Sequence, residues 1–324
     1  MAITRRKFIQ QGSTAVAAIT AGSLFPGCSG SKDRLSNKGM PMRRLGKTNE
    51  MVSILGYGCG SQFMLMPDGE WEESFMHAYE EGINYFDTSA SYGAEQPEPS
   101  EVRLGKILPP IRKNILLLTK TQKRDPEEAR AEFERSLERM KTDYVDFLLI
   151  HSIQPDDNVS EIEKGVYRYF MDLKAQGMTR FVGFSSMDSA ERSVELLDNL
   201  DFDLCLLAVN ATNYRNFNDI AMPSARAKDV GVISMKIMRN IIDKGVATAT
   251  ELLEYNWNLN GVHCNLVSQT GIAPLVENME IARGYGKKTG SSTDPRELER
   301  RLAHLAGPHA LDWAKPGYYD GMMC

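Results

Sequence analysis

The sequence is poor in cysteine, which argues against stabilisation by disulfide bonds or by a structural zinc ion. Five cysteines occur among 324 residues, and none belongs to a Cys-x-x-Cys pair. Their spacing matches neither a disulfide framework nor a structural zinc site. Three of them lie inside apolar runs, where buried free thiols are common. We therefore expect a hydrophobic core to stabilise the fold.

Long hydrophobic runs and clusters of a single charge are also missing. The mean hydropathy of −0.35 excludes a polytopic membrane protein. The formal net charge is −5, and no basic cluster of the kind that binds nucleic acid is present. The histidines form no His-x-His or His-Glu-x-x-His pair, so no metal is expected. An apolar share of 42% and a charged share of 25% are typical of a globular protein.

Residues 1–28 differ from the rest of the chain. Arg5, Arg6 and Lys7 precede an apolar run, Ser13 to Phe25, that is shorter than the roughly 20 residues of a spanning helix. A basic start followed by a short apolar region is typical of an export signal, and the paired arginines resemble the twin-arginine type. Cys28 follows as a candidate lipid-anchor position. The sequence thus predicts the export machinery as a partner and a periplasmic or otherwise exported protein. The alternative is a disordered basic terminus on a cytoplasmic protein.

The rest of the chain alternates apolar runs with helical patterns. Residues 29–39 are polar and small, as in a linker, and "MPMRRLGKTNEMVSILGYG" predicts a hairpin turning near Gly46. Eight apolar runs then recur about every 30 residues. The runs are Ser53–Tyr57, Ile83–Phe86, Ile115–Thr119, Val145–Ile150, Phe181–Phe184, Leu204–Val209, Gly231–Met235 and Cys264–Ser268.

Helix signals separate these runs. Asp125 and Pro126 mark the start of one helix, and Gly177 marks the end of another. Alternating strands and helices indicate parallel strands with right-handed crossovers. Eight such units predict a (β/α)₈ TIM barrel with an N-terminal β-hairpin over residues 40–290. Residues 291–324 are expected to form a C-terminal helix and tail, with Asp294 as a helix start signal.

The stretch "GYGCGS", residues 56–61, nearly matches the dinucleotide fingerprint Gly-x-Gly-x-x-Gly. That motif must open a helix, so that phosphates meet the helix amides. Because Pro67 and Gly69 follow soon after, no helix is expected here. We interpret the stretch as the top of the first barrel strand.

Four polar residues stand at the ends of three consecutive predicted strands. Asp87 ends the second, with Tyr92 in the loop after it, while Lys120 ends the third and His151 the fourth. Strand ends form the working face of such barrels. A neighbouring ammonium lowers the pKa of a phenol, a carboxylate pairs that ammonium, and an imidazole can orient a carbonyl. The set predicts proton donation to a carbonyl oxygen, which is half of a reduction; the hydride must come from nicotinamide or flavin.

The motifs "FDTSASYG", "LLLTKTQKR", "LLIHS" and "RFVGFSS" resemble the aldo-keto reductases, over about residues 42–282. The resemblance implies a barrel that reduces an aldehyde or ketone, sugar-like compounds included, with NADP(H). It implies Tyr92 as general acid, tuned by Lys120 and Asp87, with His151 orienting the substrate. It also implies a set of cofactor-binding positions. These are Gly58, Cys59, Asp87, Ser185, Ser186, Lys236, Gly271, Glu277 and Asn278.

Several alternatives remain open at this level. No Lys or Arg occurs between Lys244 and Arg283, where the family usually places a cation for the 2′-phosphate, so NAD(H) is the alternative cofactor. Lys236 could contact the pyrophosphate of the cofactor, or it could be a solvated lysine on the surface, and the sequence favours neither. An exported protein would carry its nicotinamide tightly bound and could oxidise and re-reduce the same substrate. The alternative function is therefore that of an isomerase or epimerase. A non-catalytic binding or regulatory relative is the other alternative. Substrate identity and oligomeric state do not follow from the sequence.

Overall fold

The computed structural model describes residues 38–287 and 294–321. The predicted export signal, Cys28 and most of the predicted linker lie outside these residues. The predicted boundary between the barrel and the C-terminal segment, at residues 290 and 291, also lies outside them.

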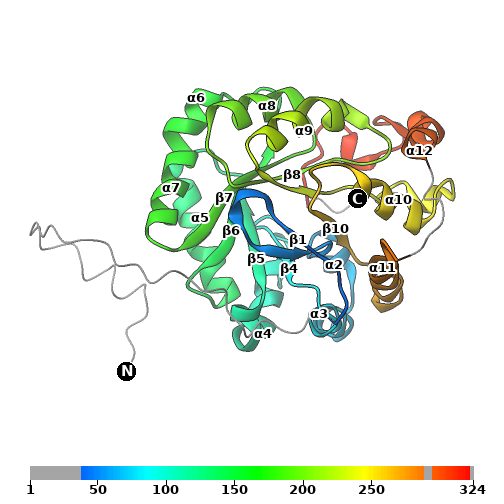
Figure 1. Ribbon diagram of the computed structural model, residues 1–324. Coiled ribbons are helices and arrows are strands. Elements are labelled where there is room, and N and C mark those ends of the chain that lie inside the picture. The colour runs from blue at the N-terminus through cyan, green and yellow to red at the C-terminus, as the bar shows by residue number, and fades with distance from the viewer. Residues whose placement is uncertain (1–37, 288–293, 322–324) are drawn as a thin grey trace, which may run out of the picture.

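Eight parallel strands form a closed barrel in the order β10-β3-β4-β5-β6-β7-β8-β9, and helices surround it (Figure 1). Each strand overlaps one predicted apolar run, so the predicted (β/α)₈ barrel is confirmed. Almost every strand residue is buried, as expected of strands enclosed between a packed interior and a helical layer. The strands are β3 (Leu55–Gly58), β4 (Tyr85–Asp87), β5 (Leu116–Thr121), β6 (Val145–Ile153), β7 (Thr179–Ser186), β8 (Leu204–Leu207), β9 (Gly231–Ser234) and β10 (Cys264–Ser268).

The hairpin is confirmed as a separate two-stranded antiparallel sheet. Strands β1 (Met42–Arg44) and β2 (Met51–Ser53) pair with Met42 opposite Ser53. Leu45, between them, is fully buried against the first residue of β9, where a Cβ on Gly231 would lie 2.7 Å from the Leu45 side chain. The hairpin therefore covers the end of the barrel at which the strands begin, and leaves the opposite rim open for a site.

Most of the described helices follow the strands, as the alternation predicts. Asp125 caps α5 by accepting hydrogen bonds from the amides of Glu127 and Glu128, with Pro126 at the first helical position. The longer helices are α3 (Glu70–Glu80), α4 (Ser100–Ile111), α5 (Pro126–Met140), α7 (Arg168–Ala175), α8 (Ala190–Asn199), α9 (Phe217–Ala227), α10 (Ala249–Asn258), α11 (Ile272–Gly284) and α12 (Pro295–Leu302).

One local expectation is wrong. A short helix, α2 (Ser61–Leu65), does follow Gly60, because the chain completes one turn before Pro67 is reached. The predicted helix end at Gly177 is confirmed, since α7 stops at Ala175 and Gly177 has a φ of +74°. The helical segment before this end is not continuous. It divides into α6 (Val159–Ile162), a π-helical turn with Gly165 in a non-helical conformation, and α7. Glycine tolerates this distortion because it has no Cβ.

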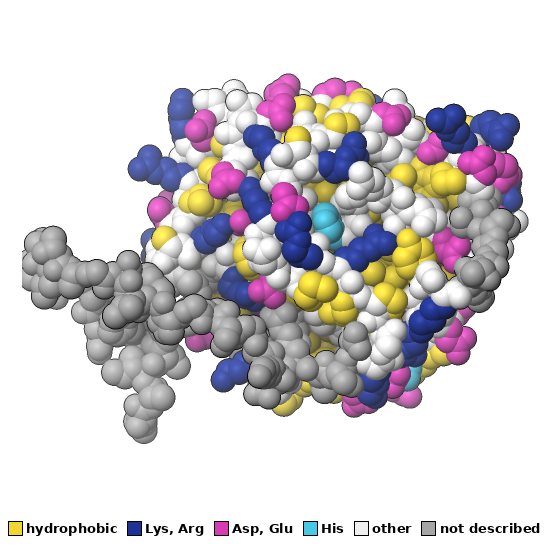
Figure 2. All heavy atoms as spheres, in the orientation of Figure 1, with side chains coloured by type: hydrophobic (Ala, Val, Ile, Leu, Met, Phe, Trp, Pro, Cys, Tyr) yellow, Lys and Arg dark blue, Asp and Glu magenta, His cyan; other side chains and the backbone are white. Residues whose placement is uncertain are grey.

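No helix in the described part of the chain is long and apolar enough to cross a membrane. On the face shown in Figure 2, basic and acidic side chains are interspersed over the elements. This distribution is consistent with the absence of a single-sign patch noted in the sequence.

Candidate active site

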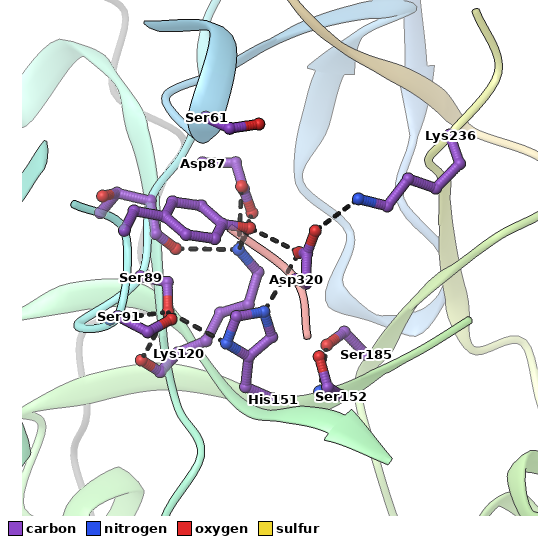
Figure 3. A network of polar contacts seen from close by, with 12 residues as sticks. Ser61, Asp87, Ser89, Ser91, Lys120, His151, Ser152, Ser185, Lys236 and Asp320 are labelled. Atoms are coloured by element: carbon purple, nitrogen blue, oxygen red, sulfur yellow. Dashed lines mark hydrogen bonds and ion pairs between the residues drawn. The ribbon is translucent and has the colours of Figure 1, made fainter. Parts of the chain in front are cut away.

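The four predicted catalytic residues meet at the rim where the strands end. Asp87 is the last residue of β4, Lys120 lies in β5 and His151 in β6, and Tyr92 comes from the loop after β4. The in-register pairing of neighbouring parallel strands brings these ends together. All four side chains are buried. Figure 3 shows Asp87, Lys120 and His151 pointing toward one another.

Lys120 is the centre of this cluster. Its Nζ donates to Asp87 Oδ2 at 2.9 Å, to Tyr92 OH at 3.0 Å and to the Thr88 carbonyl at 2.9 Å. The ammonium therefore has three oxygen partners, which accounts for the three donors it has. A fully buried ammonium needs such partners, because an unpaired one would be strongly destabilising.

Burial is the main cause of the pKa shifts of Asp87 and Tyr92. It raises the pKa of Asp87 to about 6, although Lys120 acts to lower that pKa. Burial also raises the pKa of Tyr92 well above its usual value, with further contributions from Asp320 and Asp87. The expectation that Lys120 gives Tyr92 a lowered pKa is therefore wrong for this arrangement of the chain. Loss of hydration and two nearby carboxylates outweigh one ammonium.

His151 is oriented from both sides of its ring. Nδ1 lies 3.0 Å from Ser89 Oγ, and Nε2 lies 3.1 Å from Asp320 Oδ2. Burial lowers the pKa of His151 to about 4, although Asp320 acts to raise it. The imidazole is thus neutral near pH 7, and with its proton on Nε2 it can donate toward the centre of the site.

Asp320 is the site residue that the sequence did not reveal. Its Oδ2 accepts a hydrogen bond from Tyr92 OH at 2.6 Å, and its Oδ1 lies 2.5 Å from Lys236 Nζ (Figure 3). Burial alone would raise the pKa of Asp320, but Lys236 and His151 hold it well below its usual value. Asp320 follows α12 in an irregular segment, and no periodicity or motif in the sequence relates it to Tyr92.

A cavity of about 520 Å³ extends from this cluster along the rim beside β9 and β10. Four of the predicted cofactor-binding residues line it: Asp87, Lys236, Glu277 and Asn278. A cation that the sequence analysis did not single out, Arg239, lines it as well. The cavity therefore joins the cluster of Asp87, Tyr92, Lys120 and His151 to α11.

The other five predicted cofactor positions do not line this cavity. Cys59 is fully buried, and Gly58 packs so closely that a Cβ would lie 2.7 Å from Ser268 Oγ. Gly271 directly precedes α11. The hydroxyls of the serine pair are engaged elsewhere. Ser185 Oγ accepts from the Ser152 amide at 2.8 Å, and Ser186 Oγ donates to the Ser189 carbonyl at 3.1 Å.

The cavity residues fit a dinucleotide. Lys236 and Arg239 can meet phosphate oxygens, and Glu277 and Asn278 offer polar groups to a nucleoside at the far end. The volume is in the range of small-molecule sites. Among residues 38–287 and 294–321, no group of three or more His, Cys, Asp and Glu side chains could hold a metal ion.

Comparison with known proteins shows the family of this chain. Residues 55–258 match the model of the aldo/keto reductase family. L-galactose dehydrogenase of Arabidopsis thaliana is 30% identical over 209 residues, which cover 60% of this chain and 64% of that protein. The uncharacterized oxidoreductase YqkF of Bacillus subtilis (strain 168) is 32% identical over 161 residues, 46% of this chain and 49% of that one. The chain thus spans less than two thirds of the length of either curated relative.

Solved structures show the same fold. A candidate aldo-keto reductase from Pseudomonas aeruginosa is 27% identical, with a TM-score of 0.63 over 75% of this chain and 94% of that one. The holo form of aldo-keto reductase AKR11C1 from Bacillus halodurans gives a TM-score of 0.65 at 19% identity, over 82% and 96%. The matched segment, residues 55–258, includes β3 to β9 and the four clustered side chains. This chain therefore belongs to the aldo/keto reductase family.

Proposed function

We propose that this protein reduces the carbonyl group of an aldehyde or ketone with NAD(P)H, and that Tyr92 is the general acid. The observation that carries the proposal is the cluster itself. Lys120 Nζ contacts both Asp87 and Tyr92, and the neutral His151 faces the same point. A bound nicotinamide supplies the hydride that reaches the carbonyl carbon.

The protein's own residues supply the proton. Tyr92 OH donates to the carbonyl oxygen as that oxygen gains charge, and the O–H bond of the phenol breaks. Lys120, 3.0 Å away, stabilises the resulting phenolate. Asp87 keeps Lys120 paired in its buried position, and His151 Nε2 donates a hydrogen bond that orients the carbonyl. In the reverse direction the phenolate accepts the proton of an alcohol.

A sugar-like substrate is supported by the similarity to L-galactose dehydrogenase over 209 residues.

We further propose NAD(H) as a rival to NADP(H), because neither cation that lines the cavity comes from β10 or α11. A 2′-phosphate at the Glu277 end would meet a carboxylate instead. Export by the twin-arginine route, with lipidation at Cys28, rests on residues 1–28 alone.

Tyr92→Phe tests the proposal. Loss of the phenol hydroxyl removes the proton donor, and general acid catalysis of this kind contributes about 10²–10⁴-fold. We expect kcat/KM for D-glyceraldehyde with NADH or NADPH to fall by about that factor. Tyr319→Phe is the matched control, because Tyr319 lies in an exposed position near the same rim.

Two results would count against the mechanism. If Tyr92→Phe turned over carbonyls as fast as the wild type, Tyr92 would not be the acid. If neither NADH nor NADPH bound to the wild-type protein in a fluorescence titration, the reductase proposal would fail as a whole.

A further inference from the structure

Residues Tyr318–Gly321, here called the strap, lie across the mouth of the active site. Asp320 is the innermost part of the strap. It accepts a hydrogen bond from Tyr92 OH at 2.6 Å, lies 3.1 Å from His151 Nε2, and pairs with Lys236 at 2.5 Å. Figure 3 shows its carboxylate between Lys236 and His151. The strap thus occupies the two groups that the proposed reaction directs at a carbonyl oxygen.

Residues on either side of Asp320 fix the strap in place. The Tyr318 hydroxyl accepts hydrogen bonds from Arg239 at 3.0 Å and Lys236 at 3.3 Å, and both cations lie near the Tyr318 ring. Gly321 packs directly on the Tyr92 ring, since a Cβ there would lie 2.2 Å from Tyr92 Cδ1. Its φ of +95° is also one that glycine adopts readily. The contacts of Tyr318 and Gly321 therefore hold the strap in its position over the active site.

The contacts of Asp320 and those of a substrate are mutually exclusive. The Tyr92 hydroxyl has one proton, so it cannot donate to Asp320 and to a carbonyl oxygen at the same time. Asp320 is only about 8% exposed, and it fills the space in front of Tyr92 and His151. A carbonyl oxygen that meets both donors must take the place of its Oδ2.

We propose that the strap is an intramolecular inhibitor: Asp320 occupies the carbonyl-oxygen position, and the strap must move away before a substrate can react. The inference rests on the proposed reductase function. An equilibrium between closed and open strap lowers the fraction of binding-competent enzyme and raises the apparent KM by the inverse of that fraction. At saturating substrate the closed state is displaced, so kcat is not affected.

The kinetic test compares Asp320→Ala with the wild type in the full chain. If the strap is closed about nine tenths of the time, KM for D-glyceraldehyde falls about tenfold in the variant while kcat changes less than twofold. Tyr319→Ala is the matched control, because Tyr319 lies in the strap but is 47% exposed. It should leave KM unchanged. Asp320→Asn keeps the size of the side chain, and it replaces Asp320→Ala in the KM comparison if Asp320→Ala does not fold.

Three kinetic results would overturn the strap proposal. An unchanged KM in both Asp320 variants would show that the carboxylate does not compete with substrate. A lower kcat would show that Asp320 takes part in the reaction. An equal fall of KM in Tyr319→Ala would show that loosening of the segment, and not the carboxylate, is responsible.

A second test needs neither coenzyme nor turnover. Acetate is a free carboxylate that can enter the position vacated by Asp320. It should therefore raise the Tm of Asp320→Ala more than that of the wild type, by mass action. Equal shifts in the two proteins would overturn the strap proposal. If no form reduces any carbonyl, the reductase function fails, and the acetate comparison still decides whether the strap covers the site.

Discussion

The acidity of Tyr92 depends on which group lies in front of it. With Asp320 in contact, burial and two carboxylates raise the pKa of Tyr92 well above its usual value. Departure of Asp320 would remove one of those carboxylates and leave Lys120, 3.0 Å away, as the nearest charge. The closed strap therefore does more than block the carbonyl position. It also holds the phenol in its less acidic state.

A prediction at the residue scale concerns His151 and pH. Burial lowers its pKa from 6.5 to about 4 in the folded protein. Below pH 6.5 the unfolded chain binds a proton at this position and the folded protein does not. The stability contributed by the neutral ring is therefore fully present above pH 6.5 and is lost as pH falls to about 4. The loss is on the order of 3 kcal/mol for a shift of this size.

Urea unfolding at several pH values between 7 and 4 measures this effect. We expect His151→Gln to show a weaker decrease of unfolding free energy with falling pH than the wild type. Asp87, whose pKa is raised to about 6, acts in the opposite direction, but it is present in both proteins. His309→Gln, at an exposed position, should behave like the wild type. Parallel pH profiles for His151→Gln and the wild type would contradict the prediction.

At the scale of elements, the rim depends on helices that pack closely against one another outside the barrel. Gly105 in α4 faces the backbone of α5, and a Cβ there would lie 1.9 Å from the Arg139 carbonyl oxygen. Because both groups belong to the main chain, neither can move aside cheaply. Glycine at this position therefore sets the distance between the two helices that follow β4 and β5.

Gly105→Ala tests this packing. Alanine in a helix is normally more favourable than glycine by about 1 kcal/mol. Here we expect the reverse, a loss of about 1–3 kcal/mol in unfolding free energy, because the added methyl group forces a backbone shift. Gly284→Ala is the matched control, since Gly284 ends α11 with nothing within 4 Å of a Cβ. Chemical denaturation should show Gly284→Ala as neutral or slightly stabilising. A stabilising Gly105→Ala would contradict the prediction.

At the scale of the whole molecule, Arg43 ties the hairpin to the last part of the barrel. Its guanidinium donates to the carbonyls of Val262 at 2.7 Å and Trp257 at 2.8 Å, and to Tyr285 OH at 3.2 Å. It also lies over the Tyr285 ring. One side chain near the start of the barrel thus satisfies acceptors contributed more than 200 residues later.

Arg43→Ala should lower the unfolding free energy by about 2 kcal/mol, because three hydrogen bonds donated by a charged group are lost. Arg44→Ala is the matched control. Arg44 is the next residue, but its ion pair with Asp229 is about half exposed, and such pairs contribute about 0–1 kcal/mol. Urea unfolding of the two variants checks the difference. Equal losses would contradict the role given to Arg43.

The repeating architecture and the meeting of four polar side chains at one rim could be predicted from the sequence. Apolar runs, helix caps and strand ends are set by neighbouring residues, so their pattern predicted the barrel, the hairpin and the positions of Asp87, Lys120 and His151 at one rim. Tyr92 could be included because it lies only five residues after Asp87. The short helix α2 was missed because a single turn leaves too little periodicity to detect.

The contact between Asp320 and Tyr92 could not be predicted from the sequence, because it depends on the folded chain. Asp320 is separated from Tyr92 by 228 residues, and an irregular strap has no periodicity that would reveal its contacts. The direction of the Tyr92 pKa shift also followed from the fold. It depends on how much water burial removes and on which carboxylates end up nearby, not on the residue types alone.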